Sequence, residues 1–220
     1  MSTESSLREE ICRVGRSLFE RGYVHASAGN ISVRLGSGSF LITPSDACLG
    51  FLDPARLAHL GADGVQADGD RASKTLALHR RIYDAAPDAQ CVIHSHSTHL
   101  VALTLQGVWS ADDIVPPITP YFVRKVGHVP LIPYHRPGDA AVADAVAERI
   151  VRFASQGTPI RAVMLDRLGP NVWHESPAAA MAVLEELEET ARLWLTCTPK
   201  PTPLTAAQID DLRRAFGAAW

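Results

Sequence analysis

The chain has 220 residues, enough to bury one large hydrophobic core, and we expect a single domain over residues 1–220. Its net charge of -3 gives no basic excess, which argues against nucleic-acid and membrane-surface partners and favours a small-molecule substrate. The N-terminal run MSTESSLREE is polar and acidic, and no apolar run approaches the roughly 20 residues of a membrane span, so we expect a cytoplasmic protein. The four cysteines form no C-x-x-C pair and are expected to be buried thiols.

The first half of the chain predicts a helix, a hairpin, a second helix and a strand. Ser6 and Glu9 form a capping box at the start of an amphipathic helix. Two strand-like runs, 31–35 and 40–43, flank a Gly-Ser turn in the manner of a hairpin. The run SKTLALHRRIYDAA predicts a helix that begins at Ser73, and CVIHSH predicts a strand that leads into another helix.

The second half continues the alternation of helix and strand. VPLIPY predicts a strand, a helix follows from Asp139, and RAVMLD with NVWH predicts a hairpin around Gly169. Pro177 begins a long helix, and Thr205 with Gln208 caps the last one. Because several strands are joined by hairpins and covered by helices, the pattern predicts an α/β fold with an α/β/α layer structure, and not a doubly wound parallel sheet.

Three histidines stand at the junction between the predicted strand and the helix after it, in CVIHSHSTHL. Residues two apart on a strand share a face, so His94 and His96 can present two ring nitrogens to one metal ion. His99 is expected to orient one of them as a supporting partner. The spacing alone leaves open that His94 and His96 are ordinary histidines at the mouth of a strand.

Motifs along the chain resemble those of the class II aldolase/adducin family: SAGNISVR, LITPSD, VIHSHSTH and AAAMAVLEELEETARLWL. The run PPITPYFVRKVGHVPLIPYHRPGD is similar to the 3-oxo-tetronate 4-phosphate decarboxylase branch of that family, which is also L-fuculose-phosphate aldolase-like. The resemblance implies a three-layer α/β/α sandwich around a mainly antiparallel mixed sheet, and homotetramers with sites between subunits. It also implies a divalent ion, zinc first and manganese, cobalt or iron as alternatives, with His94 and His96 as its first two ligands.

The resemblance also implies where substrate and protons are handled. The loops SAGN, TPSD and ASK are the candidates for holding a phosphate, through donors on Asn30, Ser45, Ser73 and Lys74. Without the resemblance, the same loops read as ordinary turns. Tyr121 matches a family tyrosine that reaches a neighbouring subunit's site as a proton donor.

Three positions depart from the family pattern. The usual catalytic Glu is replaced by Thr75, which cannot exchange a proton at neutral pH, and the usual third metal histidine by Leu168, which cannot ligate. Asp46 stands in the TPSD loop where the family has a neutral residue, and it would repel a phosphate unless it is compensated. Asp166 is a candidate substitute ligand, because it should share a strand face with Leu168.

Three functions remain open from the sequence. The first is a metal-dependent carbon–carbon lyase that performs aldol cleavage or decarboxylation of a small sugar-derived oxo acid or sugar phosphate through a metal-stabilised enediolate. The second is altered chemistry on the same scaffold, such as iron-dependent oxidation or an isomerisation of an unphosphorylated substrate. The third is a non-catalytic binding or assembly module with a silent site.

Overall fold

One sheet of eight strands runs through the computed structural model, which describes residues 3–220. The strand order is β4-β3-β2-β1-β5-β8-β7-β6, and every pair is antiparallel except the parallel pair β6 and β7. The strands span β1 Asn30–Arg34, β2 Phe40–Ile42, β3 Ala58–Leu60, β4 Gln66–Asp68, β5 Cys91–His94, β6 Leu131–Ile132, β7 Ala162–Leu165 and β8 Gly169–His174. The mainly antiparallel sheet that the family resemblance implies is confirmed.

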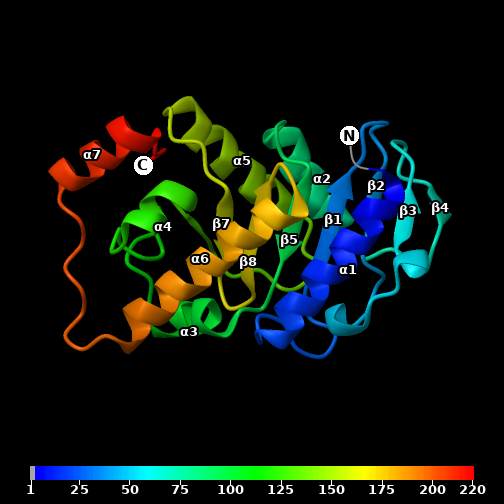
Figure 1. The fold of residues 1–220 in the computed structure, drawn as a ribbon, viewed down its shortest axis with the longest axis horizontal. Coiled ribbons are helices and arrows are strands. Elements are labelled where there is room, and N and C mark those ends of the chain that lie inside the picture. Colours follow the sequence, from blue (N-terminus) through cyan, green and yellow to red (C-terminus); the bar gives the residue numbers. More distant parts are fainter. Residues whose placement is uncertain (1–2) are drawn as a thin grey trace.

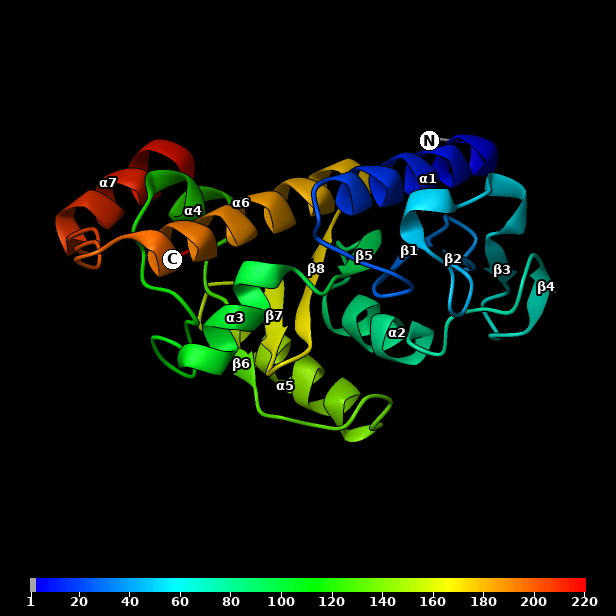
Figure 2. The same ribbon diagram turned by 90° about the horizontal axis from the view of Figure 1, so that it is seen from below.

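Helices cover both faces of this sheet (Figures 1 and 2). They span α1 Glu4–Glu20, α2 Leu76–Ala85, α3 Thr98–Gln106, α4 Pro120–Lys125, α5 Ala141–Ser155, α6 Pro177–Thr196 and α7 Ala206–Phe216, with short 3-10 turns at Leu49–Phe51 and Pro54–Arg56. Figure 2 shows α1 and α6 on one side of the strands and α2 and α5 on the other. The fold is therefore the predicted three-layer α/β/α sandwich.

Strand alternation divides the buried side chains into two cores. On β1, Ile31 and Val33 face a core shared with α1, α3, α4 and α6. On the opposite face, Val92 and Trp173 pack in a second core with α2 and α5. Polar side chains enter the layer on this second face, where β1 contributes the buried Ser32.

Several element boundaries differ from those predicted. The prediction that Ser6 and Glu9 form a capping box is wrong. The first helix begins earlier, and its N-cap is Thr3, whose side chain accepts a hydrogen bond from the Ser6 amide. The helix predicted from Ser73 begins at Leu76, and the strand predicted to include His96 ends at His94. The capping box of Thr205 with Gln208 is confirmed. Short strands β3 and β4 were not predicted, because three-residue strands carry too little periodicity.

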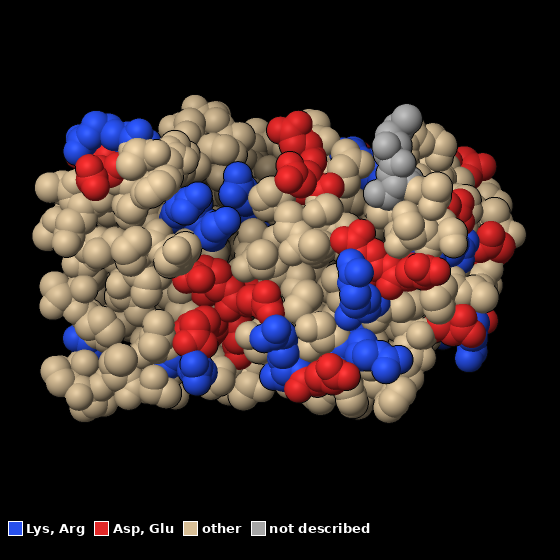
Figure 3. Space-filling view, viewed as in Figure 1, with Lys and Arg blue, Asp and Glu red and all other residues tan. Residues whose placement is uncertain are grey.

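The charge distribution agrees with the near-neutral composition. On the face drawn in Figure 3, acidic and basic side chains alternate in small groups over a mostly uncharged surface. Of the helices in residues 3–220, none combines the length and the apolar character needed to cross a membrane.

Candidate metal and substrate site

The two histidines of the HSH motif converge at the end of β5. His94 is the last residue of the strand, and His96 lies in the short loop before α3, yet their Nε2 atoms are 3.1 Å apart. Strand alternation does not bring them together, since β5 ends between them. Instead the loop is held against the next strand, where the Ser95 amide donates to the carbonyl of Pro170 at 3.3 Å.

Hydrogen bonding fixes the tautomer of His94. Its Nδ1 lies 2.9 Å from the Pro170 carbonyl, which can only accept, so Nδ1 carries the hydrogen and Nε2 keeps its lone pair. Burial, and after it the neighbouring His96, lowers the pKa of His94 to about 4. Burial and then His25 lower the pKa of His96. Both rings are therefore neutral at pH 7, the state in which imidazole binds a metal.

A row of polar side chains crosses the sheet beside this pair. In the strand register Asn30 of β1 and Asn171 of β8 lie on either side of His94. Both asparagines are buried, and Oδ1 of Asn30 and both amide atoms of Asn171 have no hydrogen-bond partner. Because buried polar atoms without partners are rare, the row offers donor and acceptor positions to a bound molecule. Asn171 was not predicted, although an amide within the apolar run of NVWH was a signal.

The predicted phosphate loops lie side by side. Pro44 pairs with Ala72 in an isolated bridge, and the Ser45 amide donates to the Arg71 carbonyl at 2.8 Å. The Ser73 amide in turn donates to the Thr43 carbonyl at 3.3 Å. The loops that carry Ser45, Ser73 and Lys74 are thus brought together next to the start of β1, where Asn30 lies.

Asp46 has a cationic partner that the sequence analysis did not identify. It is exposed, with φ of +60°, and its carboxylate lies 3.5 Å from the guanidinium of Arg71. The cation that compensates Asp46 in the structure is therefore Arg71. The pair reduces the negative charge that would oppose a phosphate in this loop.

Thr75 and Leu168 have structural roles that do not involve binding a metal. Thr75 lies at the N-terminus of α2, and its Oγ1 is 2.8 Å from the Ser73 hydroxyl. Leu168 is half-buried and packs against the second core. Its turn is pressed onto the histidine loop, since a Cβ on Gly169, with φ of +131°, would lie 2.0 Å from the Ser95 carbonyl oxygen.

The strand-face argument that made Asp166 a candidate ligand does not hold in the structure. β7 ends at Leu165, and the Leu168 amide donates to the Leu165 carbonyl in a turn, so strand alternation does not apply to Asp166. Within residues 3–220, Asp166 joins no group of three His, Cys, Asp or Glu side chains whose ligand atoms lie within 4.8 Å of one another.

His99 supports a helix and not the histidine pair. Its Nδ1 lies 2.8 Å from the carboxylate of Glu188, which is 3% exposed. The same carboxylate accepts the backbone amides of His99 and Leu100 at 3.0 and 3.1 Å. Glu188 of α6 thus caps α3 from outside, and the expectation that His99 orients His94 or His96 is wrong.

Tyr121 lies on the surface. It is the second residue of α4, its side chain is 60% exposed, and α4 packs against α6 and α7. This placement leaves the phenol accessible to another subunit.

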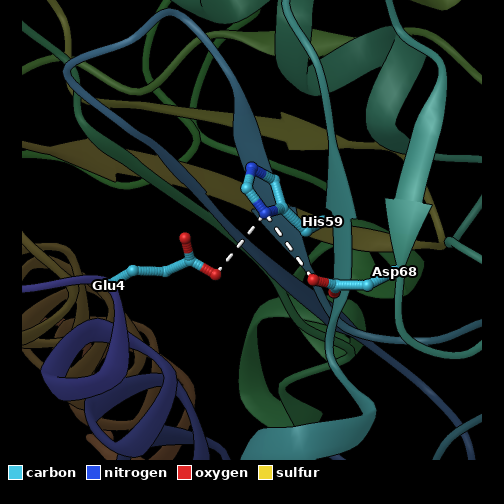
Figure 4. A group of neighbouring side chains, drawn as sticks. All are labelled: Glu4, His59 and Asp68. Atoms are coloured by element: carbon cyan, nitrogen blue, oxygen red, sulfur yellow. Dashed lines mark ion pairs between the residues drawn. The ribbon is translucent and has the colours of Figure 1, made fainter.

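A second cluster contains ligand-type groups at the edge of the sheet (Figure 4). His59 of β3 lies 3.5 Å from the Glu4 carboxylate and 3.9 Å from that of Asp68, and the three ligand atoms lie within 4.8 Å of one another. The Arg8 guanidinium lies 2.8 Å from each carboxylate. The site of a cation between these two carboxylates is therefore taken by an arginine.

An open cavity of about 440 Å³ lies beside the TPSD loop, lined by Pro44–Cys48, Phe51–Asp53, Arg56, Asp70 and Arg71. Neither His94 nor His96 lines it. Three aspartates against two arginines give it no excess of positive charge.

The model of the Class II Aldolase and Adducin N-terminal domain matches residues 9–195. The chain belongs to the class II aldolase and adducin family. This class II aldolase family member is 57% identical over 227 residues to the 3-oxo-tetronate 4-phosphate decarboxylase of Cupriavidus necator, with all of both chains covered. It is 44% identical to the protein of the same name from Escherichia coli, with 96% of each chain covered.

Solved structures agree with this assignment. YgbL from Klebsiella pneumoniae matches with a TM-score of 0.88 and 41% identity, over 97% of this chain and 100% of that one. The L-fuculose-1-phosphate aldolase from Thermus thermophilus matches with a TM-score of 0.71 and 27% identity, over 86% and 92%. The resemblance to the decarboxylase branch is confirmed.

A divalent ion fits the histidine pair in this family member. Two nitrogens that bind one ion at about 2.1 Å lie roughly 3.0 to 3.4 Å apart, and the Nε2 atoms of His94 and His96 are separated by 3.1 Å. The Nδ1–H of His94 is held by a carbonyl, as in most metal-ligating histidines. The pair thus supplies two oriented, neutral ligands.

Proposed function

We propose that the protein is a divalent-metal-dependent decarboxylase of a small phosphorylated 3-oxo sugar acid. The observation that carries the proposal is the convergence of the His94 and His96 Nε2 atoms at 3.1 Å, beside the unpartnered amide of Asn30. The name shared by relatives at 57% and 44% identity supports the reaction and the substrate class. The proposal treats residues 1–220 as one catalytic domain.

His94 and His96 would hold the ion, which supplies Lewis-acid stabilisation of the negative charge that develops on the substrate's 3-oxo group. Asn30 lies next to His94 in the strand register, and its unpartnered Oδ1 can accept a hydrogen bond from a substrate hydroxyl. Ser45, Ser73 and Lys74 come from two adjacent loops and would bind the phosphate through hydroxyls and an ammonium group. Binding of the phosphate by these two loops would then hold it away from His94 and His96.

The replacement of the family's Glu by Thr75 favours decarboxylation over aldol cleavage. Aldol cleavage begins with removal of a hydroxyl proton and needs a base. A β-keto acid already reaches the site as a carboxylate: its carbon–carbon bond breaks, carbon dioxide leaves, and the electron pair passes to the 3-oxo group. Only one proton must then be delivered to carbon. Thr75 does not prevent that sequence.

Tyr121 of a neighbouring subunit is the proposed proton donor to that carbon. Its exposure on α4 supports a role between subunits, and the proposal requires a homo-oligomer, expected to be a tetramer. A tyrosine phenol can serve as a general acid when it is held within hydrogen-bond reach of the reacting atom.

The experiment is an assay of carbon dioxide release from a 3-oxo-tetronate 4-phosphate, before and after chelation and after readdition of Zn²⁺, Mn²⁺ or Co²⁺. Metal-dependent release that is lost in His96→Ala and retained in His174→Ala is the expected result. Failure of every metal to support release, in protein that binds metal, would refute the proposed reaction.

A further inference from the structure

Two protein ligands hold a catalytic divalent ion weakly, because such sites normally have three protein ligands and one open position. Thr75 and Leu168 cannot complete the set, and the His99 ring is bonded to Glu188. His79 is fully buried on α2, where its Nδ1 lies 2.8 Å from the Ser32 hydroxyl and its Nε2 has no partner. Its ring forms no group with His94 and His96 in which all ligand atoms lie within 4.8 Å of one another, and close packing around it leaves no room for the ring to move toward them. A side chain that is free to move toward the pair is therefore the better candidate for the third ligand.

His25 is the side chain in the structure that faces the pair from the segment between α1 and β1. Its ring lies edge-on to that of His96, with the ring centroids 6.3 Å apart and an angle of 77° between the planes. The rings of His94 and His96, whose Nε2 atoms already converge, have centroids 5.0 Å apart. The His25 ring would need to approach by about 1 Å to match that spacing.

The backbone of this segment is fixed while the His25 side chain is free. Val24 is buried in the first core, and the Ala28 amide donates to the His25 carbonyl at 2.9 Å. Gly29, with φ of +84°, lies so near that a Cβ there would be 2.9 Å from the His94 carbonyl oxygen. The His25 side chain itself is exposed, so rotation about its two side-chain torsions is open.

We infer that His25 is the third protein ligand of the metal site. It would take the role of the family's usual third histidine, at whose position this chain has Leu168. His25, His94 and His96 would then present three imidazoles and leave a position for the substrate. In the structure their ligand atoms are not yet all within 4.8 Å of one another, so the ring must swing inward when the ion binds. The inference rests on the proposed metal site but not on the identity of the substrate.

The test is the dissociation constant of Zn²⁺ for the untagged full-length protein, compared with His25→Ala, His96→Ala and His59→Ala. His59→Ala is the matched control, because it removes a histidine from the arginine-filled cluster. We expect binding at least about 100-fold weaker in His25→Ala and His96→Ala, and unchanged in His59→Ala. Far-ultraviolet circular dichroism and the thermal midpoint of unfolding check that His25→Ala is folded.

A second variant separates ligation from an indirect effect. His25→Cys loaded with Co²⁺ should show a near-ultraviolet thiolate-to-cobalt charge-transfer band that the wild type lacks. Unchanged Zn²⁺ affinity in His25→Ala would overturn the inference, as would weakened affinity without the band in His25→Cys. If three histidines bind metal but no carbon dioxide is released, the inference stands and the proposed reaction fails.

Discussion

Two clusters of metal-ligand groups within residues 3–220 differ in what already occupies them. Glu4, His59 and Asp68 bring three ligand atoms within 4.8 Å, but the Arg8 guanidinium bridges the two carboxylates. His94 and His96 bring only two ligands together, and no cation of the chain is paired with their nitrogens in the described residues. The number of ligand-type side chains alone would favour the Glu4, His59 and Asp68 cluster as the metal site. The neutral imidazole nitrogens and the unpartnered buried amide atoms favour the His94 and His96 pair.

The hydrogen bonding around the two clusters also differs. At the Glu4 cluster the acceptors are satisfied: the His59 Nε2 lies 3.1 Å from Ser39, and Arg8 also donates to backbone carbonyls. Beside His94, buried atoms of Asn30 and Asn171 have no partner. A structural ion-pair cluster completes its own hydrogen bonding, whereas a binding site leaves some of it to the ligand.

The largest predicted effect separates the two clusters by turnover. His96→Ala should lower the rate of metal-dependent carbon dioxide release on the order of 10³-fold, because it removes an ion that stabilises the transition state. His59→Ala should leave the rate within a factor of two or so. Steady-state assays at saturating metal measure both. Equal losses in the two variants would break the comparison.

Subunit mixing tests whether the histidine site is shared between chains. Tyr121→Phe alone should lower turnover by about 100-fold through loss of the proton donor. Co-expression of Tyr121→Phe with His96→Ala should restore about a quarter of wild-type activity, because some interfaces then combine an intact His96 with an intact Tyr121. Mixed oligomers no more active than either parent would show that Tyr121 does not serve a neighbour.

Stability should depend on pH through the buried histidine next to the site. Burial, and after it the charge of a protonated His94, lowers the pKa of His79 to about 3. The unfolded state binds the proton from about pH 6.5 downward, so this contribution to stability is complete above that value and is lost as the pH falls toward 3.

From pH 7 to pH 5 this loss is about 2 kcal/mol for His79 alone. The variant His79→Gln should therefore show a decrease in the free energy of unfolding between those pH values that is smaller by about that amount. Urea unfolding of metal-free protein at both pH values provides the measurement. Parallel pH profiles in the two proteins would rule out the buried neutral state of His79.

The smallest effect concerns the arginine-filled cluster. Arg8→Ala should cost about 1 to 2 kcal/mol of stability, since four of its hydrogen bonds are lost. It should also create a weak divalent-ion site at the two freed carboxylates, which a further His59→Ala change abolishes. Calorimetric titration with Mn²⁺ detects it. No new binding in Arg8→Ala would mean that Arg8 is not what keeps metal out.

The sequence predicted the architecture better than the site. Helical periodicity and turn signals placed the long elements such as α6, and the H-x-H spacing together with the family resemblance singled out His94 and His96 as candidate ligands. The reason given for that pair was incomplete, since His96 lies beyond the strand and a loop hydrogen bond to Pro170 brings the rings together. Spacing reports neighbours along one chain segment, and loop geometry is set by tertiary contacts.

Residues contributed by distant segments escaped the sequence analysis. Asn171 reaches His94 only through the β5–β8 register, and His25 approaches His96 because Val24 and Gly29 dock its segment on the core. Glu188 forms a hydrogen bond with the ring of His99, which is 89 residues away in the sequence. No local pattern encodes such pairings, because they depend on which strands and helices become neighbours.

The most direct test of the account is anomalous diffraction from crystals of the metal-free protein soaked in Zn²⁺, recorded on both sides of the zinc absorption edge. The account predicts one strong anomalous peak within bonding distance of the Nε2 atoms of His94 and His96. A peak between Glu4, His59 and Asp68 with none at the histidine pair would contradict it.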